Sequence, residues 1–220
     1  LSYDEQLNRT VEVDSLDLIP LTQRFEKMGK TLDEDNLSNL KLIGKEGGKF
    51  YPSHGLLILL GHYEHVETKC GLFKGKDMTV FLDKKEYSND IFSQLESAQL
   101  FIQNYLKLKV EILGLQSTET PEVPIAAIRE VLINAYVHRD YSNFGRDIKI
   151  GIYDDALNVV SPGGLPNGLT TEDIQQGRSE IRNRVIARVF KELNFIEQWG
   201  SGITRVKKLG TDAGLPSPKE

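Results

Sequence analysis

The spacing of apolar residues predicts helices along much of this chain. Apolar side chains recur every three or four positions, as on one face of a helix, over residues 18–28, 89–108, 124–141 and 181–193. Thr31 followed by Glu34 indicates a capped start for a shorter helix through residue 40. Ser53 is the expected cap of a helix over residues 56–60, and Gly202 stands where a last helix through residue 209 begins.

Strict alternation of apolar and polar residues predicts two β-hairpins. The first pairs residues 66–72 with 78–82 around a turn at 74–77, and the second pairs 148–152 with 157–160. Residues 44–48 are expected to form a turn, and the polar residues 1–16 to wrap over a surface. The segment 111–122 is rich in turn formers, so it is the expected boundary between two modules, residues 1–110 and 111–220. The predicted fold class is α+β.

Composition narrows the classes of function. The chain has 220 residues and one cysteine, Cys70, which excludes an internal disulfide and is typical of a reducing cytoplasm. Its longest apolar run, residues 56–60, is far shorter than the roughly 20 residues that a membrane span needs. A net charge of −5 and a pI near 5.5 argue against DNA binding by the chain as a whole, although they do not exclude a local basic patch. The start at Leu1 suggests a fragment of a longer protein.

One predicted helix, over residues 124–141, carries an unusual set of polar side chains. Glu130, Asn134 and His138 stand four residues apart and share one face, opposite an apolar stripe of Ile125, Ile128, Leu132 and Ala135. Such a stripe is commonly a solvated helix face. It also suits a metal–nucleotide site, because an asparagine oxygen ligates Mg²⁺ and a glutamate orients water for attack on a phosphate. Both interpretations stay open on the pattern alone.

Two glycine-containing segments also allow a structural and a ligand-binding interpretation. Ser161, Gly163 and Gly164 follow a predicted strand, and Gly200, Ser201 and Gly202 precede a predicted helix. Glycines there commonly form turns, but free amides at a helix start also bind phosphate.

Other enzyme motifs fail on spacing or residue type. The run 44–49 is one residue short of a phosphate loop and has Phe50 in place of Ser or Thr. His62, His65 and Cys70 lack the second pair that a zinc site needs. Arg178, Arg182, Arg184 and Arg188 cluster together, either as a solvated group or as cations for a triphosphate.

Four blocks in order resemble a bacterial and archaeal family known as RecG-like helicase C-terminal proteins, also described as transcriptional regulators. The blocks cover residues 128–141, 161–166, 178–183 and 200–203. The resemblance implies a DNA-binding domain of the Schlafen-AlbA type in the longer protein, so DNA would be bound through domains outside this chain. It does not imply a helicase motor, since this sequence has no phosphate loop.

The module 111–220 further resembles the GHKL ATPases, which implies a Bergerat-type α/β sandwich with a mixed sheet covered by helices. By that likeness Glu130 is the hydrolytic base and Asn134 ligates Mg²⁺ beside ATP. His138 or Arg139 would contact phosphate, and Gly200, Ser201 and Gly202 would wrap it. Ser161, Gly163 and Gly164 would lie at the adenine, where the family places an aspartate; serine is a weaker, uncharged partner.

The sequence therefore supports two hypotheses. In the first, the C-terminal module of a regulator binds ATP and Mg²⁺ and couples them to domain arrangement, with slow hydrolysis if any. In the second, the module is a scaffold for dimerisation or domain contact that binds no nucleotide. The Glu130 and Asn134 pair favours the first, and Ser161 the second. A homodimer and a cytoplasmic location are further expectations.

Overall fold

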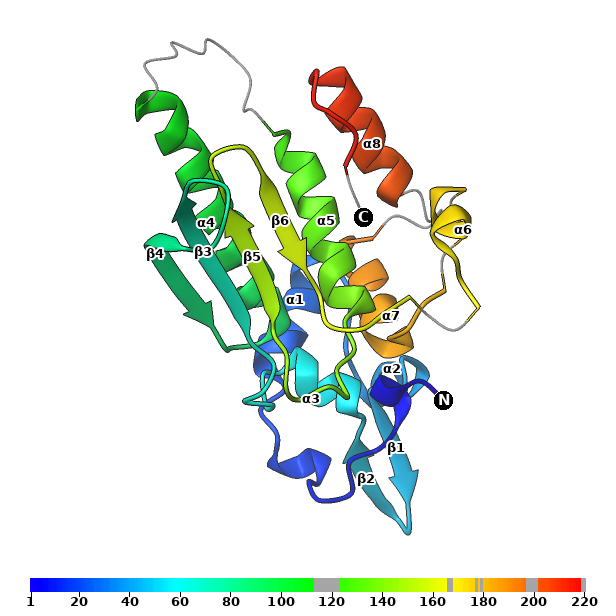
Figure 1. The fold of residues 1–220 in the computed structure, drawn as a ribbon. Coiled ribbons are helices and arrows are strands. Elements are labelled where there is room, and N and C mark those ends of the chain that lie inside the picture. The colour runs from blue at the N-terminus through cyan, green and yellow to red at the C-terminus, as the bar shows by residue number, and fades with distance from the viewer. Residues whose placement is uncertain (113–122, 166–167, 177, 179, 197–201, 219–220) are drawn as a thin grey trace.

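A computed structural model describes residues 1–112, 123–165, 168–176, 178, 180–196 and 202–218 (Figure 1). It is a mixed α and β structure with two sheets. The helices are α1 (Ile19–Lys27), α2 (Glu34–Asn39), α3 (His54–Leu59), α4 (Ile91–Ile112), α5 (Ile125–His138), α6 (Thr171–Gln175), α7 (Arg184–Glu192) and α8 (Gly202–Asp212). The strands are β1 (Ile43–Glu46), β2 (Lys49–Pro52), β3 (Thr68–Lys74), β4 (Val80–Tyr87), β5 (Ile148–Ile152) and β6 (Leu157–Val160). No helix in these described ranges is long and apolar enough for a membrane crossing.

The larger sheet has the strand order β4-β3-β5-β6. Its two hairpins are antiparallel, and β3 and β5 join them in parallel, with Gly71 opposite Gly151. A parallel pair needs a long crossover, which here includes α4 and α5. The sheet thus takes two strands from each side of the boundary expected near residue 111. That boundary adjoins residues 113–122, which lie outside the described ranges, and it stays a prediction.

Helices α4 and α5 cover one face of this sheet. The hydroxyl of Thr68 on β3 donates to Gln94 Oε1 of α4 at 2.9 Å and lies 2.5 Å from Tyr136 Oη of α5. Because one buried strand residue meets both helices, both lie on the same side. Figure 1 shows α4 running behind the strands, and none of the described helices lies in front of them.

Most predicted elements are confirmed, with informative exceptions. The predicted turn at 44–48 is in fact part of a hairpin, β1 with β2, whose turn uses Gly47 and Gly48 at positive φ. The cap of α2 is Asp33, not Thr31, since the Asp33 carboxylate accepts from Asn36 N at 2.8 Å. Ser53 caps α3 as predicted.

The N-terminal segment is more than a surface wrap. Asp4 is fully buried, and its carboxylate accepts a hydrogen bond of 2.9 Å from Ile186 N in the first turn of α7. Glu5 forms an ion pair with Arg188 of the same helix. A carboxylate at a helix start satisfies unpaired amides and suits the helix dipole. The first residues of the chain therefore cap a helix about 180 positions away.

Candidate functional site

Helix α5 presents the predicted polar stripe only partly to solvent. Ile128, Leu132 and Ala135 are buried as predicted, whereas Ile125 is 47% exposed and lies outside the packed stripe. Glu130 and Asn134 are half-buried rather than solvated. The reason is that α8 packs along this side of α5 (Figure 1).

The first residue of α8 lies directly on the Glu130 and Asn134 pair. A Cβ placed on Gly202 would stand 3.2 Å from Asn134 Nδ2 and closer still to Glu130 Oε1. Only glycine therefore fits without movement of these side chains. The structure brings together the start of the last helix, a carboxylate and an amide. Gly200 and Ser201 lie outside the described residues.

At the C-terminal end of α5, side chains bind the free carbonyls of the helix. A helix leaves its last four carbonyls without intrahelical partners, and here each of the four accepts a side-chain hydrogen bond. Ser161 Oγ donates to Ala135 O at 2.7 Å and Tyr141 Oη to Tyr136 O at 2.7 Å. The other two bonds run from Asn183 Nδ2 to Val137 O at 2.7 Å and from Arg182 Nη1 to His138 O at 3.2 Å. We call these four donors, Ser161, Tyr141, Arg182 and Asn183, the α5 clasp.

Arg182 also fixes the loop that follows β6. Its second guanidinium nitrogen donates to Gly164 O, and its Nη1 occupies the place where a Cβ of Gly163 would be. Gly163 has φ of +109°, a region that side chains rarely adopt. Both the backbone and the packing therefore require glycine at 163, for a structural reason that is independent of any ligand.

Arg139 has a structural position. It is fully buried, and its guanidinium donates to Glu67 O at 3.0 Å, Arg146 O at 3.0 Å and His65 O at 3.2 Å. It also lies over the ring of Tyr141, 5.3 Å from the centroid. This fork holds the end of α5 to the segments before β3 and β5. A phosphate contact by Arg139 would require these bonds to break, so we leave it out of the proposed site.

His138 is the last member of the polar stripe, and its carbonyl accepts a hydrogen bond from Arg182 of the clasp. Burial lowers the pKa of its imidazole, and the nearby Arg182 guanidinium lowers the pKa further. His138 is therefore a neutral side chain at pH 7, which can donate or accept one hydrogen bond but brings no positive charge to a phosphate.

Sequence reasoning missed the roles of Tyr141, Arg182 and Asn183. All three fall in the four blocks that carry the family resemblance. Arg182 and Asn183 bind carbonyls of α5 that lie more than 40 residues earlier in the chain. The only available signal was their presence in those blocks, because no local pattern specifies such a long-range contact.

Comparison with known proteins found a family match, in the C-terminal part of the chain, and a solved structure with a similar fold. Residues 145–220 match the model of a family described as "Putative ATP-dependent DNA helicase recG C-terminal". No curated protein matches the chain. A solved structure, the DIP2311 protein from Corynebacterium diphtheriae, is similar over 95% of this chain with a TM-score of 0.74 and 20% identity. The chain spans 36% of that protein's length, and at this identity the likeness shows the fold alone. Residues 145–220 are thus similar to an ATPase-like RecG C-terminal domain, on a fold that another solved protein shares.

Proposed function

We propose that the face of α5 beneath α8 binds ATP with Mg²⁺, in a GHKL-like manner, and that the bound nucleotide sets the arrangement of domains in a longer regulatory protein. The observation that carries the proposal is the contact of Gly202 with Glu130 and Asn134. Phosphate is favoured at the start of α8 by unpaired amides and the helix dipole. The Asn134 oxygen would ligate Mg²⁺, and Glu130 would orient a water molecule.

Ser161 is compatible with the base-reading half of this site. Its hydroxyl proton is used on Ala135 O, but a serine oxygen keeps two acceptor lone pairs. One of them would accept the adenine amino hydrogen, more weakly than an aspartate would. Gly163 and Gly164 would line the same edge, held by Arg182. The neutral His138 would serve as a hydrogen-bond partner rather than as a cation.

Calorimetric titration of residues 1–220 with ATP and with a non-hydrolysable analogue, each with and without Mg²⁺, tests this proposal. Asn134→Ala is expected to remove the effect of Mg²⁺ on affinity. Glu130→Ala is expected to keep binding and to stop any turnover. No heat and no thermal shift at millimolar nucleotide would reject the proposal, and unchanged turnover in Glu130→Ala would reject the assigned base.

Ser161→Asp separates the base-reading role from the clasp. Aspartate supplies the acceptor that GHKL proteins use, but it cannot donate to Ala135 O and it places negative charge at the negative end of α5. We expect lower stability together with tighter ATP binding. Ser161→Ala is the control that loses the bond without gaining the carboxylate. Equal ATP affinity in the two variants would remove Ser161 from the proposed site.

A scaffold that binds no nucleotide is the second candidate, and a specific feature favours it. Glu130 already brings a carboxylate to the start of α8, where a phosphate would have to bind. Two like charges there would repel each other unless a metal ion lies between them. Under this alternative, Glu130→Gln would leave ATP affinity undetectable, whereas under the first proposal the same change would allow binding with a weaker dependence on Mg²⁺.

A further inference from the structure

The face of the large sheet away from α4 and α5 has an ordered arrangement of side chains. On β3 the helix side holds Thr68, Cys70 and Leu72, so Lys69, Gly71 and Phe73 point to the other side. On β5, buried Ile148, Ile150 and Ile152 likewise leave Lys149, Gly151 and Tyr153 on the open face. Strand register places these residues in rows across the sheet.

The first row is aromatic. Phe73 stacks on Tyr153 with ring centroids 4.9 Å apart and an interplanar angle of 10°, and Phe81 of β4 lies 4.5 Å from Phe73. Phe73 is buried at 4% exposure, whereas Phe81 is 56% exposed. The rings therefore form a layer whose solvent side is mainly Phe81. Met78 and Leu82 extend the same exposed apolar end of the β3–β4 hairpin.

Two paired glycines form the floor under this layer. Gly71 lies opposite Gly151 in the parallel pair. A Cβ on Gly71 would stand 2.8 Å from the Phe73 ring, and one on Gly151 would stand 2.7 Å from the Tyr153 ring. The rings can lie flat on the sheet only because both positions lack side chains. This explains two strand glycines that are otherwise unfavourable.

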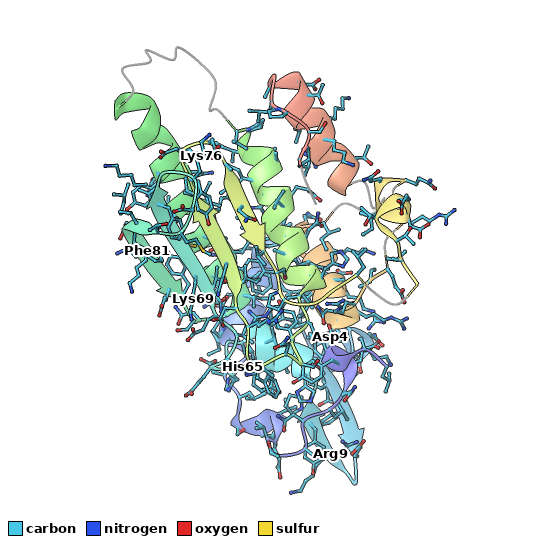
Figure 2. All side chains as sticks on the ribbon, in the orientation of Figure 1. Asp4, Arg9, His65, Lys69, Lys76 and Phe81 are labelled. Carbon is cyan, nitrogen blue, oxygen red and sulfur yellow. The ribbon has the colours of Figure 1, made fainter. Side chains whose placement is uncertain are left out.

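Lysines border the aromatic layer on the same face. Lys84 lies opposite Gly71, and Lys69 and Lys149 are paired one row further along. Lys69 forms an ion pair with Asp147 at 3.0 Å, while Lys84 and Lys149 form none with the residues that the structure describes. Figure 2 labels Phe81 near one end of the sheet and Lys69 near the other. Glu86 is the acidic neighbour opposite Lys69.

We propose that this face binds single-stranded nucleic acid, with a base stacked on Phe81 and the phosphates on Lys84, Lys149 and Lys69. Exposed aromatic rings beside a basic row are the combination by which proteins hold single strands without reading sequence. A duplex keeps its bases stacked inside and offers no base face to the rings. The inference does not depend on nucleotide binding at α5, which lies on the other side of the sheet.

A second copy of the chain is a poorer occupant of this region. β4 is an edge strand, and two edge strands can pair antiparallel about a two-fold axis. A pairing that overlaps most of the strand would place Asp83 opposite Asp83 or Lys84 opposite Lys84. Like charges directly opposite each other destabilise a sheet.

Fluorescence anisotropy with labelled single-stranded DNA and RNA of about 12 nucleotides tests the proposal, using residues 1–220 without added ATP. We expect binding that weakens with salt, with a slope of log affinity against log salt near −2, since each phosphate contact contributes about −0.7 for single strands. Phe81→Ala should weaken binding about 5- to 100-fold, the range for loss of one base–aromatic stack. Lys149→Ala should make the salt slope shallower by about 0.7.

The chain provides matched controls. Lys85 follows Lys84 on β4 but belongs to the opposite face, where it pairs with buried Cys70. Lys84→Ala should weaken binding several-fold more than Lys85→Ala does. Phe144 is an exposed phenylalanine outside the strands, where it packs on His65, so Phe144→Ala should leave binding unchanged.

Any one of the following results would overturn the proposal. The first is no anisotropy change at about 0.1 mM protein in low salt, the weak end of non-specific binding. The second is equal affinity for a duplex of the same length or no effect of Phe81→Ala. The third is a dimer in sedimentation that Phe81→Ala dissociates, because a second copy would then cover the face.

Discussion

The middle and the C-terminal end of α5 differ in how their polar groups are used. In the middle, Glu130 and Asn134 meet the start of α8, and a glycine leaves them room. At the end, four carbonyls are bound by four side chains of the α5 clasp, and Arg139 is buried on three further carbonyls. The polar groups in the middle face the start of another helix, whereas those at the end bind main-chain carbonyls.

This difference changes how the sequence blocks should be interpreted. Residues at ligand-binding positions by family resemblance, such as Ser161 and Arg139, are bound to main-chain carbonyls in the fold. Residues of a block can therefore have a structural role at a helix end, because buried carbonyls there cost free energy when they have no hydrogen-bond donor. The clasp would hold α5 at a fixed position, so that its middle face can meet α8 in one register.

The largest effect is expected at Arg139. Arg139→Ala should lower the free energy of unfolding by about 4 kcal/mol, because three part-buried carbonyls lose a charged donor. Urea denaturation measures this. Arg146→Ala, which removes an exposed arginine nearby, should change stability by less than about 0.5 kcal/mol. A stable Arg139→Ala protein that lost only nucleotide binding would contradict this structural role and place Arg139 in the proposed nucleotide site.

Asn183 tests the clasp itself. Its amide donates to Val137 O and Arg139 O, both at 2.7 Å, so Asn183→Ala should cost about 2–3 kcal/mol. Asn183→Asp should cost at least as much, because a carboxylate cannot donate and its charge opposes the helix dipole. Asn39→Ala, at an exposed position in α2, is the control for the substitution. Stability equal to that of the control would contradict the assigned role.

Gly202 tests the middle of α5. Gly202→Ala should cost about 1 kcal/mol, since the end of the flexible Glu130 side chain must move away from the added Cβ, and should shift any nucleotide affinity as well. Gly210 lies in the same helix with no atom within 4 Å of an added Cβ. Gly210→Ala should be neutral or stabilising by up to about 1 kcal/mol. Thermal unfolding with and without ATP measures stability and nucleotide binding in both variants. Identical behaviour of the two variants would show that the contact of Gly202 with Glu130 has no effect on either.

The smallest effect is expected from pH. The pKa of His138 is lowered in the folded protein, first by burial and then by Arg182. The unfolded chain takes up a proton below its ordinary pKa of about 6.5 while the folded chain does not, so stability falls as pH drops below that value. Burial lowers the pKa of His54 and His65 too, so they add to the loss. His138→Gln should reduce the pH slope by at most about 1.4 kcal/mol per pH unit, measured by urea denaturation between pH 7.5 and 5.5. An unchanged slope would show that His138 does not contribute.

Local patterns predicted much of the secondary structure and less of the site. The helices α1, α3, α4, α5 and α7 and the hairpins β3–β4 and β5–β6 follow from apolar period and caps. Ile125 and Ile181 were assigned to apolar stripes but are exposed, because period alone does not say where a packed face ends. The roles of Glu130, Asn134 and Gly202 came from resemblance and stay predictions, although the described geometry brings these three residues together.

Local sequence specifies most of the helices and strands, because those choices depend on neighbours within one or two turns. Three long-range contacts could be seen only in the packed fold: β3 lies beside β5, Asp4 caps α7, and Ser161 closes the end of α5. These contacts join residues far apart in the chain, and their free energy exists only once the intervening segments have packed. The aromatic layer over Gly71 and Gly151 is of the same kind, since neither hairpin alone contains both glycines.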